Sequence, residues 1–404
     1  MTYSLQVPTF VLSLLLFCHS LASAQVSNPA VLNAFLSEAV DNTKIPGVVA
    51  LAVDKNQVIY RGVFGHRDVA AGEPMMSDTI FNLASMTKPV AATAIMMLVE
   101  EGKLALDDPI SAYLPTLGGR EVIDAFDQSD GSYSTRPAVR EITIRHLLSH
   151  SSGLAYGFAS HVIAQISGGS GTANDLPLLH DPGDGWTYAG GIGLVATLLE
   201  RIEGQGLDSF IEQRIFAPLG MHDTSYIVPA DKHARVVTVH ASTDDGLTES
   251  PRPVDVRSPV SGDGGLYGTA SDYAKFIQLF LNEGVAPDGT RLLSTESIRL
   301  MGQNQLGGVT VRSQDEPFPN RARSFPLGAG RDGFGLGFQI TAGPADTGMR
   351  TPGSMSWAGI FNTEFWIDPA TGIGAVLLMQ YLPFYDEDAL DTLVGFETRL
   401  YEGL

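Results

Sequence analysis

The sequence predicts an α+β fold, an α/β sandwich in which helices flank one antiparallel sheet and a mostly helical domain is inserted. Three observations indicate this class. Strand-like segments lie near both ends of the chain, helix-like segments dominate its middle, and 404 residues can bury a large core. We expect residues 25–105 and 260–404 to form the sheet domain and residues 106–259 to form the inserted helical domain.

Residues 1–24 have the features of a secretory signal peptide. Residues 10–17 are apolar but too short to span a bilayer, and Ala22-Ser23-Ala24 is a small-residue cleavage pattern. The single cysteine, Cys18, lies inside this segment, and Phe17 is bulky where a lipoprotein site needs a small residue. We therefore expect an exported protein, periplasmic or secreted, rather than a lipoprotein. The mature chain would contain no disulfide and no cysteine metal site.

The formal net charge is −20 at pH 7. Nucleic acids and anionic membranes both require a basic protein face, so the sequence argues against either as a partner. After residue 24 no apolar run reaches the length of a transmembrane helix, so we expect no stable membrane insertion. The sequence does not indicate the oligomeric state.

The first part of the chain predicts a helix, a hairpin and a second helix. Apolar residues recur at helical spacing over 28–42, and two apolar segments, 48–53 and 58–63, flank a short polar turn. A short strand at 79–81 then leads into a helix that contains the apolar run 91–99.

The middle of the chain is predicted to be mostly helical. Polar, glycine-rich segments at 116–140 and 167–182 predict exposed loops, and 227–258 predicts irregular structure. Helices are expected within 104–114, 142–150, 188–202, 207–215 and 271–282.

Near the C-terminus the apolar pattern changes to that of strands. Residues 335–340 predict one strand, and 355–368 and 374–380 predict a longer hairpin with its turn at 368–372. An amphipathic helix is expected over 388–401. Strands from both ends of the chain can therefore form a single sheet.

The first chemical motif is Ser85-Met86-Thr87-Lys88 at the start of a predicted helix. Residues three apart share one helix face, so Ser85 and Lys88 should point the same way. A serine hydroxyl needs a neighbouring base to act as a nucleophile, and a nearby lysine can help to remove its proton. A Ser-x-x-Lys motif alone is weak evidence, because most copies are solvated helix starts.

Further motifs resemble the serine β-lactamase and penicillin-recognising superfamily, with family VIII carboxylesterases and class C β-lactamases as the nearest groups. They occur in the family's order and span most of the mature chain. Besides Ser85-Met86-Thr87-Lys88, the matching segments are residues 144–154 (IRHLLSHSSGL), 182–190 (PGDGWTYAG), 264–269 (GGLYGT) and Trp357-Ala358-Gly359.

The resemblance implies a Ser–Lys–Tyr trio of Ser85, Lys88 and Tyr188. A phenolate beside a lysine ammonium can accept the serine proton, whereas the alternative is a buried tyrosine with a satisfied hydroxyl. The family's usual Tyr-x-Asn is Tyr188-Ala189-Gly190 here, so Lys88 should lack one hydrogen-bond partner. This departure lowers the expectation of β-lactam hydrolysis.

The third motif, Trp357-Ala358-Gly359, is where β-lactamases and peptidases of the superfamily carry Lys-Thr-Gly or His-Thr-Gly. Tryptophan cannot pair with a substrate carboxylate, but it offers an apolar wall and one N–H donor. Gly359 would let the backbone approach the substrate, and the N–H groups of Ser85 and Ile360 would form the oxyanion hole. A core tryptophan on a strand is the alternative.

Two aromatic residues, Tyr156 and Phe158, are predicted to line the pocket rim. His146 and His150 are four residues apart, but we interpret them as structural and expect neither a metal nor a cofactor. No Gly-x-Ser-x-Gly motif of an α/β-hydrolase occurs.

These features predict an exported serine carboxylesterase that cleaves small or aromatic esters through an acyl-enzyme on Ser85. The expected partner is thus a small-molecule ester. Three alternatives remain: a β-lactamase or D-amino-acid peptidase such as a DD-carboxypeptidase, an acyltransferase, and a non-catalytic binding protein that kept the fold.

Overall fold

The predicted signal peptide lies outside the residues that the structure describes, as do parts of the predicted segments 167–182 and 227–258. The computed structural model describes residues 25–168, 175–243, 246–250, 260–343 and 349–404. Within these ranges no helix has both the length and the apolar character needed to cross a membrane.

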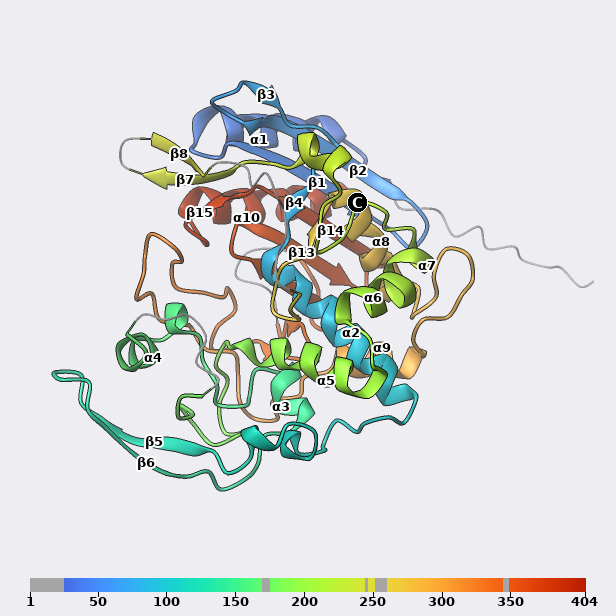
Figure 1. The fold of residues 1–404 in the computed structure, drawn as a ribbon. Coiled ribbons are helices and arrows are strands. Elements are labelled where there is room, and N and C mark those ends of the chain that lie inside the picture. The colour runs from blue at the N-terminus through green and yellow to red at the C-terminus, as the bar shows by residue number, and fades with distance from the viewer. Residues whose placement is uncertain (1–24, 169–174, 244–245, 251–259, 344–348) are drawn as a thin grey trace, which may run out of the picture.

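Strands from both ends of the chain form one eight-stranded sheet, which confirms the predicted α+β class (Figure 1). The strand order is β10-β11-β12-β13-β14-β1-β2-β3, and every neighbouring pair is antiparallel. The strands are β1 (Gly47–Val53), β2 (Val58–Asp68), β3 (Glu73–Pro74), β10 (Gly333–Phe334), β11 (Gln339–Ile340), β12 (Met355–Gly359), β13 (Thr363–Asp368) and β14 (Ile373–Leu378).

Helices cover both faces of the sheet. The central strand β1 is buried along its whole length, and its side chains alternate between two cores. Val48 packs with helices α1 (Pro29–Asn42) and α10 (Glu387–Glu402), whereas Val49 belongs to the larger core that contains α2 (Thr87–Glu100) and α8 (Ala270–Leu281). Burial on both faces explains why β1 is almost entirely aliphatic.

In the described part of residues 106–259, helical segments outnumber strands, but the predicted loop at 116–140 is wrong. Strands β5 (Glu121–Phe126) and β6 (Tyr133–Pro137) form a hairpin there, which extends at the lower left of Figure 1. The backbone of Leu178 pairs with the other edge of β5, accepting from the Ile123 N–H and donating to the Glu121 carbonyl. This long-range pairing anchors a hairpin whose own residues are mostly exposed or half-buried.

Two other segments also contain more strands than predicted. Within 227–258, β7 (Val239–Thr243) and β8 (Gly246–Ser250) form an antiparallel pair, and β7 also pairs with β15 (Tyr381–Leu382). The predicted strand 355–368 is two strands, β12 and β13, because the chain reverses between Gly359 and Thr363. Of the predicted strand 335–340, only β11 is extended and paired.

The remaining elements include the predicted helices, although the one expected within 104–114 is only the short turn η2 (Ile110–Ala112) and the helices α4 (His161–Ile166) and α9 (Thr295–Met301) were not predicted. Two short strands, β4 (Phe81–Asn82) and β9 (Tyr267–Gly268), pair beside the start of α2. The other helices are α3 (Ile144–Leu148), α4 (His161–Ile166), α5 (Gly193–Glu203), α6 (Leu207–Ile211), the π-helix η6 (Glu212–Phe216), α7 (Ala217–Leu219) and α9 (Thr295–Met301), and the 3₁₀ turns are η1 (Ala84–Met86), η2 (Ile110–Ala112), η3 (Pro115–Leu117), η4 (Gly157–Ala159), η5 (Gly190–Ile192) and η7 (Ala230–Arg235).

Candidate active site

Ser85 lies in the tight turn η1, which leads directly into α2. The preceding residue, Ala84, has a φ of 45°, a strained conformation for a residue with a side chain. The Asn82 side chain holds this turn by accepting from the Ala84 N–H at 3.0 Å. Behind the turn, the Tyr273 hydroxyl donates to the Met86 carbonyl at 2.9 Å. The surrounding structure thus fixes a strained turn that presents the Ser85 hydroxyl.

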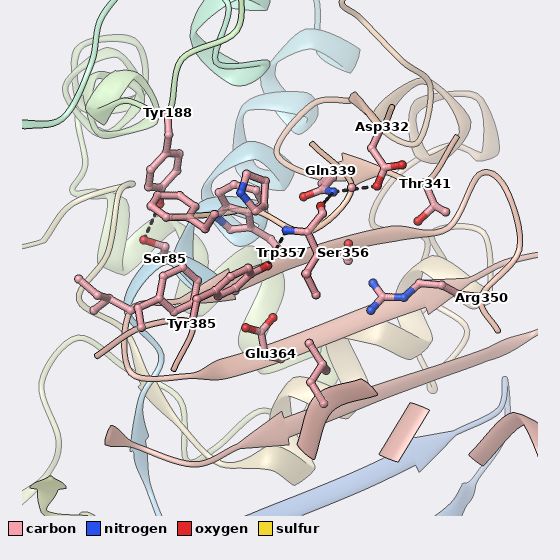
Figure 2. Close-up of a pocket in the computed structure, with 18 of the residues that line it drawn as sticks. Ser85, Tyr188, Asp332, Gln339, Thr341, Arg350, Ser356, Trp357, Glu364 and Tyr385 are labelled. Atoms are coloured by element: carbon pink, nitrogen blue, oxygen red, sulfur yellow. Dashed lines mark hydrogen bonds between the residues drawn. The ribbon is translucent and has the colours of Figure 1, made fainter. Parts of the chain in front are cut away.

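The structure brings Ser85, Lys88 and Tyr188 together. The Tyr188 hydroxyl donates to Ser85 Oγ at 2.7 Å (Figure 2). Lys88 Nζ donates to the same oxygen at 3.3 Å. Lys88 lies in the first turn of α2 and its side chain is 1% exposed. Tyr188 precedes η5 in the inserted region, and its backbone N–H donates to the Gln314 side chain. Segments far apart in the chain therefore supply the three polar atoms.

Lys88 has further partners that the sequence analysis missed. Its ammonium donates to the Asp263 carbonyl at 2.6 Å and to the Tyr156 hydroxyl at 3.3 Å. The Asp263 carboxylate lies 3.7 Å from Nζ and accepts from the Gly193 N–H at 2.7 Å. The Tyr188 ring centroid lies 5.0 Å from the same ammonium. A negative charge and an aromatic ring therefore hold the buried cation beside Ser85.

These partners correct the expectation that Gly190 leaves Lys88 short of one hydrogen bond. A Cβ added at Gly190 would lie 3.0 Å from Asp263 Oδ2 and 3.3 Å from the Tyr156 ring. The carboxylate and the phenol thus occupy the space beside Gly190, and both interact with Lys88. A Cβ at Gly193 would overlap the same carboxylate. The two glycines make room for Asp263.

Tyr156 is placed differently from the prediction. It does not line the pocket beside Ser85 but packs behind Lys88, and it is 8% exposed. Burial, together with the nearby Asp263 charge, raises the pKa of Tyr156 well above its usual range. Tyr156 therefore stays a neutral phenol. The Phe158 ring, which stacks on the Tyr156 ring, does line the pocket.

The end of strand β12 lies against the Ser85 turn. A Cβ added at Gly359 would come within 2.5 Å of the Leu83 carbonyl oxygen, so only glycine permits this approach. The next residue, Ile360, lines the pocket, and within the described part of the chain its N–H has no hydrogen-bond acceptor. This arrangement suits the predicted oxyanion hole of Ser85 and Ile360 N–H groups.

Trp357 forms a wall behind Tyr188. The two ring centroids are 5.1 Å apart, and Trp357 also packs on Phe334 at 5.2 Å. Its indole N–H is buried and has no partner among the described residues. The side chain therefore supplies apolar surface, and its donor does not serve the pocket as the sequence had suggested.

The pocket beside Ser85 is lined by aromatic, aliphatic and polar side chains. The empty space around its lining residues is about 740 Å³, a figure that includes open solvent. Figure 2 shows Ser85 and Tyr188 at one side and Arg350 at the other. The lining includes the predicted residues Trp357, Ala358 and Ile360, and it adds residues that the sequence analysis missed, among them Phe325, Leu327, Phe384, Tyr385, Glu364 and Arg350.

The two predicted structural histidines have separate surroundings. His146 caps α3, where its Nδ1 accepts from the Thr143 N–H at 3.2 Å. His150 is 1% exposed and packs edge-on against Tyr188 and Phe334 at 4.9 and 5.0 Å. Among the residues described, no three His, Cys, Asp or Glu side chains are grouped so that they could hold a metal ion.

Known proteins with this sequence pattern include esterases and acyltransferases. The Beta-lactamase family model matches residues 32–399. Esterase EstB of Burkholderia gladioli is 29% identical, over 86% of this chain and 89% of that protein. Monacolin J acid methylbutanoyltransferase of Aspergillus terreus is 28% identical, over 94% and 97% respectively.

A solved structure has the same fold. Simvastatin synthase from Aspergillus terreus (LovD6 mutant) superimposes with a TM-score of 0.78 at 28% identity, and the match covers 94% of this chain and 98% of that one. Together, the family match and these relatives support serine hydrolysis or acyl transfer as the general chemistry.

Proposed function

The chain belongs to the β-lactamase family, and we propose that it is a carboxylesterase that cleaves small or aromatic esters through an acyl-enzyme on Ser85. The observation that carries the proposal is the pair of contacts on Ser85 Oγ, from Tyr188 at 2.7 Å and from Lys88 at 3.3 Å. A nucleophile within hydrogen-bond reach of both a base and a cation is the arrangement that covalent catalysis needs.

In the proposed reaction, Tyr188 acts as the base once its own hydroxyl proton has passed to solvent, and Lys88 Nζ contacts the same Ser85 Oγ. As Ser85 Oγ bonds to the ester carbonyl carbon, its proton moves to the Tyr188 oxygen. The tetrahedral intermediate then collapses, the bond to the alcohol oxygen breaks, and Tyr188 returns the proton to the leaving alkoxide. Water repeats these steps on the acyl-enzyme and releases the acid.

The negative oxygen of the tetrahedral intermediate would be stabilised by the backbone N–H groups of Ser85 and Ile360. The close approach of Gly359 to Leu83 supports this role, because it draws the end of β12 toward the Ser85 turn. Donors fixed by the backbone need no rearrangement as the charge develops.

Esters are favoured over β-lactams by the composition of strand β12, which ends next to Ser85. Trp357-Ala358-Gly359 carries no cation for a substrate carboxylate, and the lining near it is aromatic. The esterase relative EstB supports hydrolysis, and the methylbutanoyltransferase relative supports a test of acyl transfer with the same acyl-enzyme.

The test compares wild type with Ser85→Ala, Lys88→Ala and Tyr188→Phe. We expect each variant to lose p-nitrophenyl butyrate turnover by at least ~100-fold, the scale for removing a nucleophile or its base. Two exposed residues of the same types provide matched controls, Lys55→Ala and Tyr133→Phe, which should keep wild-type rates.

Three other outcomes would redirect the proposal. Faster turnover of nitrocefin than of the butyrate ester would indicate a β-lactamase. Release of a butyrate ester of an added alcohol in place of free butyrate would indicate an acyltransferase. No burst with either chromogenic substrate would indicate a binding protein. Mass spectrometry of the quenched reaction should find the acyl group on Ser85.

A further inference from the structure

The pocket beside Ser85 also contains polar side chains that the proposed reaction does not use. Glu364 lies on β13, where it pairs with Ala358 of β12 and Leu377 of β14. Its side chain is therefore anchored in the middle of the sheet, and the residue is 8% exposed. Figure 2 shows Glu364 pointing from the sheet into the space between Tyr385 and Arg350.

The Glu364 carboxyl has no hydrogen bond or ion pair with any residue that the structure describes. The charged groups Arg350 and Asp332 around it already have hydrogen-bond partners. Arg350 donates to the Glu397 carboxylate of α10 at 2.7 and 3.0 Å, and Asp332 accepts from Gln339 at 2.8 Å. Buried polar groups in native proteins nearly always have a partner. Glu364 therefore has unused hydrogen-bonding capacity that faces the pocket.

The protonation state of Glu364 indicates which partner suits it. Burial raises its pKa to about 8, although the Arg350 charge opposes this rise. Other titratable groups around the pocket include the Glu397 and Asp332 carboxylates already described, Arg331 and the Tyr385 phenol. Arg331 donates to Asp332 at 3.0 Å. Burial raises the pKa of Tyr385 well above its usual value. At neutral pH Glu364 is thus an uncharged acid with one O–H donor and one carbonyl acceptor.

We propose that Glu364 forms a polar subsite that recognises a hydroxyl group on the acyl part of the substrate. A hydroxyl both donates and accepts, so it can use both oxygens of the neutral carboxyl. A charged group would lose its hydration in a pocket whose other charges are already paired. The carbon chain between the ester carbonyl and this hydroxyl would lie against apolar side chains that line the same pocket, namely Phe158, Phe325, Leu327, Phe384 and Leu393.

This inference rests on the proposed esterase function, and its test compares matched acyl chains. The substrates are p-nitrophenyl esters of ω-hydroxy acids of graded length and of the corresponding unsubstituted acids. For at least one length, wild type should prefer the hydroxy ester by ~10-fold in kcat/KM, the scale of one hydrogen bond to an otherwise unpaired buried group. Glu364→Leu should reverse that preference, and Glu364→Gln, which keeps a donor and an acceptor, should retain it.

Glu402→Leu, at the exposed end of α10, is the matched control and should keep the wild-type ratio. Equal turnover of both ester series by wild type, or the same ratio in wild type and Glu364→Leu, would overturn the subsite. So would a preference for ω-amino esters, which would indicate an ionised Glu364 that binds a cation. If Glu364→Leu does not fold, the ratio of kcat/KM for hydroxy and unsubstituted esters in wild type and in Glu364→Gln still tests the subsite. If wild type hydrolyses neither series nor p-nitrophenyl acetate, the esterase function itself fails.

Discussion

Replacement of Glu364 by glutamine should change how the stability of the protein depends on pH. The pKa of this carboxyl is raised by burial from its ordinary value of 4.5 to about 8. Between these two pH values the native protein keeps a proton that the unfolded chain has released. Because the native state binds more protons, its free energy of unfolding falls as the pH rises through this interval. Glutamine does not titrate, so the free energy of unfolding of the variant should not show this fall.

The magnitude follows from the two pKa values. The interval between 4.5 and about 8 corresponds to ~5 kcal/mol, at 1.36 kcal/mol for each pH unit. Water that enters the pocket would reduce the cost of ionising Glu364. We therefore expect the free energies of unfolding of wild type and Glu364→Gln to diverge by ~2–5 kcal/mol over this interval. Glu364→Gln should resemble wild type near pH 5 and exceed it in stability by that amount at pH 8.

Urea unfolding followed by circular dichroism at several pH values between 5 and 8 measures this difference. The exposed residue Glu402, at the end of α10, provides the control. Glu402→Gln should give a constant offset from wild type at every pH. Parallel stability curves for wild type and Glu364→Gln would refute the reasoning, because they would mean that Glu364 is ionised in the native protein with an ordinary pKa.

Two more substitutions test the catalytic geometry with p-nitrophenyl butyrate. Asp263→Asn removes the negative charge 3.7 Å from Lys88 Nζ, so kcat should fall ~10- to 100-fold while KM changes little; a kcat within twofold of wild type would contradict this role. Gly359→Ala places a Cβ 2.5 Å from the Leu83 carbonyl, so β12 must move and kcat should fall ~100-fold. Gly308→Ala, where an added Cβ meets no atom within 4 Å, should retain activity; equal losses in the two glycine variants would refute the close-approach argument.

Several parts of the molecule could be predicted because their signals are local. The unbroken aliphatic run of β1 and the periodicity of α8 reflect burial, and they are readable over a few residues. Ser85 and Lys88 are one helical turn apart, so their proximity follows from backbone geometry alone. The position of Tyr188 came from motif resemblance, and the structure brings its hydroxyl to 2.7 Å from Ser85 Oγ.

Other parts could not be predicted because their partners are far apart in the chain. The hairpin β5–β6 looked like a polar loop, and it depends on backbone pairing with Leu178. Asp263 lies in a glycine-rich segment, and its contact with Lys88 depends on the absence of side chains at Gly190 and Gly193. The signal that could have suggested this role is the single acidic residue in the segment 261–265 (SGDGG), next to a supporting motif.

The amino-acid sequence by itself determined the fold class, the pairing of strands from both chain ends and the proximity of Ser85 to Lys88, because hydrophobic periodicity and one helical turn encode them. Only the tertiary structure decided which groups complete the Lys88 environment and that Glu364 faces a pocket. In the sequence Glu364 is one polar residue in a strand segment. Its burial arises because α10 and the segments around Phe325 and Phe384 pack over that face of the sheet, and no local pattern encodes this packing.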